Sequence, residues 1–313
     1  MITFASTNEG DGPPNSKRPI HKSCVMKSLT DSLNEIQKSG KSLAEKKEMC
    51  IKLGLRPRDV EYLEFTGFFA GRALTFGVEI ECNVNRARVE AISAASPAFN
   101  FAYEHYNHDD NRSYYKFVTD GSVRGTDPIE CVSPILDNTT DGFKSLEVCC
   151  KVLNDAGARV NTSCGLHVHV GVSEYTGEEI VNIYKNYQRL ERLIDRFMAE
   201  SRRGNSAYYA QSLLGYHFSR DHNPDDLARH LGGRYFKVNP MAYSRHQTVE
   251  FRQHQGSTDY KKISMWVNFC CKLVEWSKDH VLENEVTDIN MVPFINAEEK
   301  NFFAGRIAYF ASL

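Results

Sequence analysis

The chain has 313 residues, of which 41% are hydrophobic, and its formal net charge is −2. A chain of this length can bury a substantial core, either in one large domain with an appendage or in two domains. The near-neutral charge argues against a general nucleic-acid or membrane surface, which would need a basic excess.

Targeting and redox features predict a cytoplasmic protein. No apolar stretch approaches the roughly 18 residues that a membrane-spanning helix needs. The N-terminal sequence "MITFASTNEGDGPPNSKRP" lacks the apolar segment of a signal peptide. Nine cysteines occur without a Cys-x-x-Cys pair. An odd number of cysteines without a signal peptide predicts reduced thiols.

The first 70 residues predict a tail followed by a helical appendage. Residues 1–22 are rich in Gly, Pro, Ser and charged side chains, which is typical of disorder. Over 23–70, apolar residues such as Leu29, Leu33 and Ile36 recur at spacings of three or four, which predicts helices.

The sequence "SGKS" at 39–42 is similar to the end of a phosphate-binding loop. Glu35 stands where such a loop requires its first Gly, and the preceding residues form a polar helix rather than a buried strand. We therefore interpret the Gly as a helix breaker.

From residue 71 onward, short strands with alternating polar and apolar residues are separated by helices. The strand-like sequences are "RALTFGVEIECNV", "TDPIECVSPIL", "CGLHVHVG" and "HQTVEFRQH". Helices are predicted over 143–155, 178–199 and 259–281. Because strands and helices do not follow a strict βαβ rhythm, we predict an α+β domain over 71–313 with a largely antiparallel sheet.

The polar side chains of these strands share one face of the predicted sheet. Successive side chains of a strand point to opposite faces, so the apolar residues lie on the other side. A solvated face of an antiparallel sheet produces the same alternation. However, the polar face holds almost only Glu, His and Arg, and Gly77 and Gly165 lie where a ligand could approach the backbone. The residues of this face are Glu79, Glu81, Glu130, His167, His169, Glu250 and Arg252.

Electrostatics favours a divalent cation on this face. Two carboxylates about 6–7 Å apart repel by roughly 0.6 kcal/mol in water, and by roughly 2.5 kcal/mol at an effective dielectric constant near 20. If the face is enclosed, a cation is the natural compensation. Four Glu and one or two His, without arranged thiolates, favour Mg²⁺ or Mn²⁺ over structural zinc.

The order of these motifs resembles a known family. Glu-x-Glu, then Glu, then Gly-x-His-x-His, then Glu-x-Arg is similar to the glutamine synthetase and glutamate-cysteine ligase superfamily of carboxylate-amine ligases, and more narrowly to its amidoligase family. The matches span roughly 74–276 and leave residues 1–70 uncovered. They are "FGVEIE", "DGSVRGTDPIECVSPIL", "CGLHVHVG", "SRRGNSAYY" and "GRYFKVNPMAYSRHQTVEFRQHQGSTD".

The resemblance implies a glutamine-synthetase-like curved antiparallel sheet that forms half a barrel, with ATP at one end and the acceptor at the other. Glu79, His167 and Glu250 would hold the metal that bridges the ATP phosphates. Glu81 and Glu130 would hold the metal near the acceptor carboxylate.

The implied reaction joins a carboxylate to an amine through an acyl phosphate. Arg252 is the best candidate for gripping the phosphate or the acceptor carboxylate, and Arg234 and Arg245 are further candidates for binding ATP. His169 would face the substrate or lie behind the metal ligands. Asp120 in "TDGSV" either binds the amine and accepts its proton or is a turn residue before Gly.

Some alternatives stay open at this point. His217, His222 and His230 have irregular spacing in a sequence rich in Asp and Pro, so we expect a mobile loop over the site rather than a zinc site. A divalent-metal hydrolase that uses the same face, or a degenerate binding protein of the same fold, would also fit. The amine and carboxylate substrates could be free amino acids, a peptide tail or a protein side chain.

Overall fold

The computed structural model describes residues 28–38, 43–65, 74–96, 98–105, 107, 112–219 and 222–313. The chain divides into two compact units, Met1–Gly71 and Arg72–Leu313. The predicted tail over 1–22 and the sequence "SGKS" at 39–42 lie outside the described residues. In the described part of the chain, no helix is both long and apolar enough to cross a membrane.

The first unit consists of short helices in its described residues. They are α1 (Leu29–Lys38), α2 (Leu43–Lys52) and α3 (Pro57–Phe65). Ile36, Cys50 and Val60 form a small buried core between them. The helix α3 begins at Pro57. Proline is favoured in the first turn of a helix because it lacks the amide hydrogen that would be unpaired there.

The second unit is built on an eight-stranded sheet with the order β2-β3-β4-β1-β6-β8-β7, in which β5 also pairs with β1. Every pairing is antiparallel except that of β2 with β3. The predicted α+β class with a largely antiparallel sheet is confirmed. The strand pairing does not show a half-barrel curvature. The strands are β1 (Thr75–Asn83), β2 (Phe101–Tyr103), β3 (Tyr115–Val118), β4 (Pro128–Val132), β5 (Leu136–Asp137), β6 (Gly165–Gly171), β7 (Val238–Asn239) and β8 (Thr248–Gln255).

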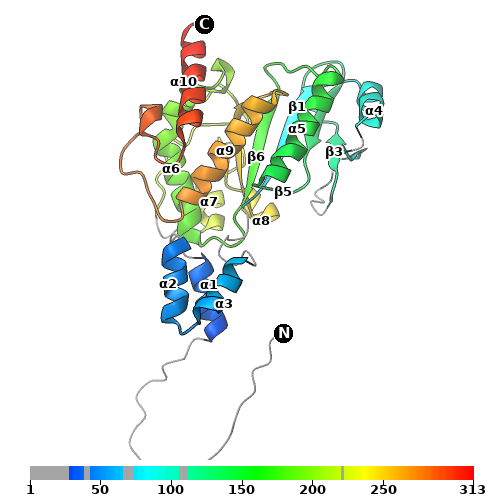
Figure 1. Ribbon diagram of the computed structural model, residues 1–313. Helices are drawn as coiled ribbons and strands as arrows, with labels where there is room; N and C mark the ends of the chain where they lie inside the picture. The colour runs from blue at the N-terminus through cyan, green and yellow to red at the C-terminus, as the bar shows by residue number, and fades with distance from the viewer. Residues whose placement is uncertain are drawn as a thin grey trace, which may run out of the picture. The chain divides into compact units, whose positions relative to one another are not determined.

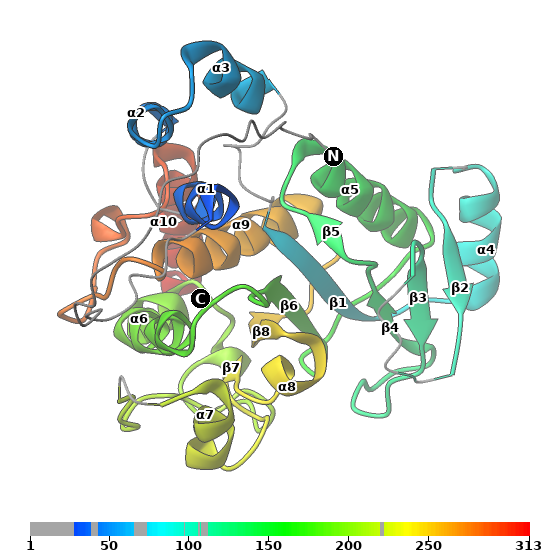
Figure 2. The same cartoon turned by 90° about the horizontal axis from the view of Figure 1, so that it is seen from below.

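Helices cover the apolar face of this sheet. Figures 1 and 2 show α5 and α9 side by side over the strands, and α9 packs against β6, α5 and α6. The α-helices of this unit are α4 (Arg86–Ala94), α5 (Thr140–Asp155), α6 (Gly177–Arg196), α7 (Pro224–Leu231), α8 (Ala242–His246), α9 (Tyr260–Trp276) and α10 (Ala297–Ala311). Short 3-10 turns occur at Glu200–Arg202 and Ile289–Met291.

The strand alternation places the core on the helix side. On β1, Val78 and Ile80 are almost fully buried among the helices, and so are Leu166 and Val168 on β6. The residues between them therefore point to the opposite face of the sheet. One face of the sheet therefore packs into the core, and the other carries the polar side chains.

The helix predicted over 259–281 ends earlier, at Trp276. Asn186 of α6 donates from its side-chain amide to the Ser277 hydroxyl and to the His280 carbonyl, at 2.9 and 2.8 Å. These buried contacts hold the chain after Trp276 in a non-helical path. The helices predicted over 143–155 and 178–199 are α5 and α6, with ends shifted by at most three residues.

Candidate active site

The strand register brings charged side chains face to face. Glu81 of β1 lies directly opposite Glu130 of β4, and Glu79 lies opposite His167 of β6. On the next pair of strands, His169 lies opposite Glu250 of β8. Opposite residues in an antiparallel pair have Cβ atoms about 4.5–5.5 Å apart, so these side chains interact across the strands.

Every residue that the sequence predicts as a site residue lines one cavity of about 410 Å³. Glu81, His167 and Glu250 are buried, each at most 5% exposed, whereas the Glu79 side chain is 24% exposed. The two arginines outside the strands, Arg234 and Arg245, are exposed. The predicted residues that line the cavity are Glu79, Glu81, Asp120, Glu130, His167, His169, Arg234, Arg245, Glu250 and Arg252.

His167 stands at the centre of the carboxylates. Its Nδ1 lies 2.8 Å from Glu79 Oε2 and 3.8 Å from Glu250 Oε1, while its Nε2 lies 3.7 Å from Glu81 Oε1. Two groups among the described residues could hold a metal ion, and in each the ligand atoms lie within 4.8 Å of one another. One is Glu79, His167 and Glu250, and the other is Glu81, Glu130 and His167.

His167 belongs to both groups, which limits how the two groups can bind metal ions at the same time. A neutral imidazole offers one lone pair, because its other ring nitrogen carries a proton. His167 can therefore complete one of the two groups at a time, and the other must take its remaining ligands from carboxylates, water or substrate. His169 belongs to neither group, so the two histidines of β6 are not equivalent.

Among the carboxylates of the cavity, Glu130 lacks compensating positive charge. Burial, together with the negative charges of Glu79, Asp120 and Glu81, raises the pKa of Glu130 well above its usual range. At Glu79, burial also acts to raise the pKa, but hydrogen bonds from His167 and His169 outweigh it and hold the pKa well below its usual range. A divalent cation near Glu130 would relieve this repulsion, and oxygen-rich donors suit Mg²⁺ or Mn²⁺.

His169 is held between Glu79 and the end of β8. Its Nδ1 lies 2.9 Å from the Thr248 hydroxyl oxygen, and its Nε2 lies 3.3 Å from Glu79 Oε1. Burial lowers the pKa of His169, but the charges of Glu250 and Glu79 outweigh this and raise it to about 9. The imidazole thus supplies positive charge behind the first metal-capable group.

Arg252 is oriented by contacts on both sides of its guanidinium. Nη1 donates to the Glu250 carboxylate, and Nε donates to the Tyr209 carbonyl at 3.1 Å. Asp120 accepts a hydrogen bond from the Ser122 amide at 2.6 Å, as a turn residue does, and it also lines the cavity. Its turn role and a role toward a ligand are therefore compatible.

A protein-family model described as "Putative amidoligase enzyme" matches residues 72–274, well over half of the chain. The chain belongs to this amidoligase family. The family predicted from the motif order is thereby confirmed.

Among solved structures, the chain is similar to a bifunctional glutathione synthetase from Pasteurella multocida, with 14% sequence identity and a TM-score of 0.40. The alignment covers 76% of this chain and 47% of that protein. The chain thus spans about half the length of the synthetase. No curated protein matches the chain.

The amidoligase cavity also contains polar residues that the strand pattern does not reveal. Lys116 of β3 is 4% exposed, and its Nζ donates to the Asn107 carbonyl at 2.9 Å. Arg202 is 6% exposed and donates to the Cys164 carbonyl at 2.6 Å, beside the Gly165 amide that donates to Glu81. Arg202 lies in "SRRGNS", which has no periodicity that would indicate its direction.

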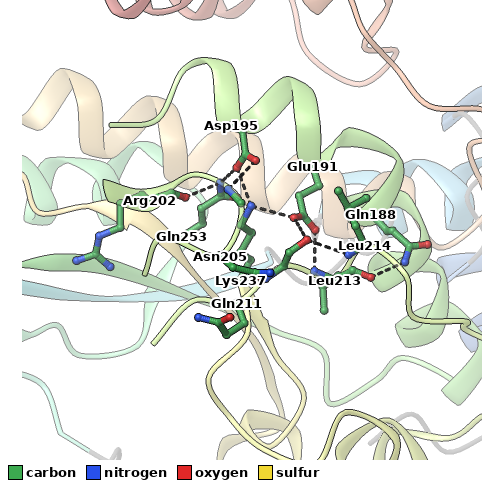
Figure 3. Close-up of polar contacts among 12 residues, drawn as sticks. Gln188, Glu191, Asp195, Arg202, Asn205, Gln211, Leu213, Leu214, Lys237 and Gln253 are labelled. Carbon is green, nitrogen blue, oxygen red and sulfur yellow. Dashed lines mark hydrogen bonds and ion pairs between the residues drawn. The ribbon is translucent and has the colours of Figure 1, made fainter. Parts of the chain in front are cut away.

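A buried ion-pair network supports the wall of the cavity (Figure 3). Lys237 is fully buried, and its ammonium donates to Glu191 at 2.9 Å and to Asp195 at 2.6 Å. Gln253 donates to Asp195 and, at 3.1 Å, to the Arg202 carbonyl. These contacts join α6 to β8 and to the segments that carry the cavity arginines.

The prediction of a loop around His217, His222 and His230 is partly wrong. Residues Pro224–Leu231 form α7, which begins with a capping box between Asn223 and Asp226. The His222 and His230 rings lie 5.2 Å apart, and His230 also contacts the Tyr216 ring. Neither metal-capable group of the described residues includes these histidines, and none of them lines the cavity.

Proposed function

We propose that the chain is an ATP- and divalent-metal-dependent carboxylate-amine ligase that forms an amide or isopeptide bond through an acyl phosphate. The observation that carries this proposal is the enclosed cluster of four glutamates around His167 in a member of the amidoligase family. The half-barrel curvature of the sheet, with ATP and acceptor at opposite ends, is part of the same proposal.

The donor set fits hard divalent cations. Glu79, His167 and Glu250 would hold an ion beside the phosphates, and Glu81 and Glu130 would hold one beside the acceptor carboxylate. Such ions neutralise charge on a transferred phosphoryl group when they are bound. The raised pKa of Glu130 supports this assignment, because a buried carboxylate among other carboxylates lacks a compensating cation.

The protein's own residues would position the reactants. A substrate carboxylate oxygen attacks the γ-phosphorus of ATP, ADP leaves, and the amine then attacks the acyl carbon and displaces phosphate. Arg252 would bind an anionic oxygen, since Glu250 and the Tyr209 carbonyl already orient its guanidinium. Arg234 and Arg245 would bind the phosphates of ATP.

The remaining roles concern the amine and its proton. Asp120 faces the cavity and would hold the amine and accept the proton it loses when the new bond forms. His169 would contact substrate oxygens next to Glu79. The substrates are a carboxylate and an amine, from an amino acid, a peptide or a protein side chain.

The proposal is tested by supplying the purified protein with ATP, Mg²⁺ and a cell extract, and analysing the products by mass spectrometry. We expect ADP, phosphate and a new species whose mass equals an acid plus an amine minus water. Condensation that needs no ATP, hydrolysis alone, or binding without turnover would contradict it. Hydrolysis alone would favour the metal hydrolase, and binding without turnover would favour the degenerate binding protein. The variant Glu250→Gln serves as the inactive control.

A further inference from the structure

Three tyrosines gather at the β8–β7 side of the cavity. The rings of Tyr208 and Tyr209 lie 5.1 Å apart, those of Tyr208 and Tyr235 lie 5.4 Å apart, and those of Tyr209 and Tyr235 lie 5.2 Å apart. Tyr208 is 69% exposed and Tyr209 is 46% exposed. Tyr209 and Tyr235 line the cavity itself. We call these three residues the tyrosine cluster.

The backbone beneath the tyrosine cluster is fixed by the site. The Tyr209 carbonyl accepts a hydrogen bond from Arg252 Nε at 3.1 Å, and the Tyr235 carbonyl accepts one from the Gln211 amide at 2.8 Å. The guanidinium of Arg234 lies 5.2 Å from the Tyr235 ring. Aromatic rings held in place but left exposed are suited to stacking, because little conformational freedom is lost when a flat ligand binds.

The strand order gives the cavity two ends. The sheet order places Glu130 on β4 and Glu250 on β8, with β1 and β6 between them. On the β8 side, Arg234 lies against the Tyr235 ring and Arg252 donates to the Tyr209 carbonyl, and Arg245 of α8 also lines the cavity. This end therefore combines positive charge with flat aromatic surface, and it adjoins the metal-capable group that contains Glu250.

We infer that the tyrosine cluster binds the base of the nucleoside triphosphate by stacking, while its phosphates lie toward Arg234, Arg245 and Arg252. A polyanion joined to a flat ring is the ligand chemistry that this end of the cavity matches. The opposite end, which holds Lys116 and Asp120, is then left for the acid and the amine. This inference rests on the proposed function.

The experiment compares ATP with inorganic tripolyphosphate, which has the phosphates but no base. Dissociation constants of the full chain are measured by calorimetry with Mg²⁺ present. We expect Tyr208→Ala and Tyr235→Ala each to weaken ATP binding by about tenfold, as the loss of one stacking partner does. Tripolyphosphate binding should change less than about twofold, since each variant keeps the three guanidinium charges.

Control variants separate stacking from other effects. Tyr235→Phe keeps the ring and should bind ATP like the wild type. Tyr309→Ala removes an exposed tyrosine of α10 that also lies beside an arginine, with Arg306 at 5.6 Å, and it should change neither ligand. Arg234→Ala should weaken both ligands together.

Two failures can be told apart. If the wild type binds both ligands and the tyrosine variants leave the ratio of the two dissociation constants unchanged, the cluster does not hold the base, and an acceptor peptide becomes the better occupant. If the wild type binds neither ligand, the proposed function itself is wrong and this inference falls with it.

Discussion

Replacing Lys237 with Met should destabilise the second unit strongly. The change removes the ammonium that lies between Glu191 and Asp195, and the side chains of Lys237 and Glu191 are both fully buried. Removing one partner of a buried ion pair costs about 3–5 kcal/mol, because the other charge stays buried without compensation.

The structure places the expected loss at the lower end of that range. Glu191 would keep hydrogen bonds from the Leu213 amide at 2.8 Å and from the Ser212 hydroxyl. We therefore expect Lys237→Met to lower the free energy of unfolding by about 3 kcal/mol. With a slope of about 3 kcal/mol per molar urea, the unfolding midpoint should fall by about 1 M.

The assay is urea unfolding followed by tryptophan fluorescence. Both tryptophans, Trp266 and Trp276, lie in α9, so the signal reports on the second unit. The matched control is Lys261→Met, which breaks an ion pair with Glu298 of similar length, 2.6 Å, but with both side chains more than half exposed. The control should unfold at the wild-type midpoint. Equal midpoints for the two variants would refute the reasoning.

Three further predictions concern the cavity and one buried histidine. Glu250→Gln should abolish ATP turnover, since an amide is a poorer ligand for a hard cation; normal turnover in saturating Mg²⁺ would show that Glu250 holds no metal. His167→Ala should raise the Mg²⁺ or Mn²⁺ concentration needed for activity, whereas His169→Ala should chiefly raise the KM of a substrate, and equal metal dependence of the two would contradict the roles. Burial lowers the pKa of His254 to about 3, below the 6.5 of an unfolded chain, so stability present above pH 6.5 is lost as the pH falls. Between pH 6.5 and 5, the free energy of unfolding of the wild type should fall by up to about 1.4 kcal/mol per pH unit more than that of His254→Gln. Urea titrations that give the two proteins parallel curves of unfolding free energy against pH would contradict this.

Strand periodicity was enough to predict which residues share the polar face. A period of two places Glu79 and Glu81 on one side whatever the pairing of the strand. It could not show that Glu81 lies opposite Glu130 or that His167 reaches both metal-capable groups, because register depends on contacts between segments far apart in the sequence.

Residues that lie outside the alternating strands were not predicted, for a related reason. Glu191 and Asp195 are four residues apart on α6 and are typical of a solvated helix face, yet Lys237 from a distant segment pairs with both. The helix α7 had a signal in the sequence, since "NPDD" combines an N-cap with Pro at the first helical position. Interpreting the Asp and Pro residues as a loop overlooked that signal.

The most direct test of the ligase proposal traces an oxygen atom from the carboxylate substrate to the released phosphate. Once the carboxylate substrate is known from the extract experiment, it is labelled with ¹⁸O and incubated with the protein, ATP, Mg²⁺ and the amine. An acyl phosphate transfers one carboxylate oxygen to phosphorus, so the released phosphate should carry one ¹⁸O for each amide bond formed when both carboxylate oxygens are labelled. Unlabelled phosphate accompanying the same product would contradict the acyl-phosphate route.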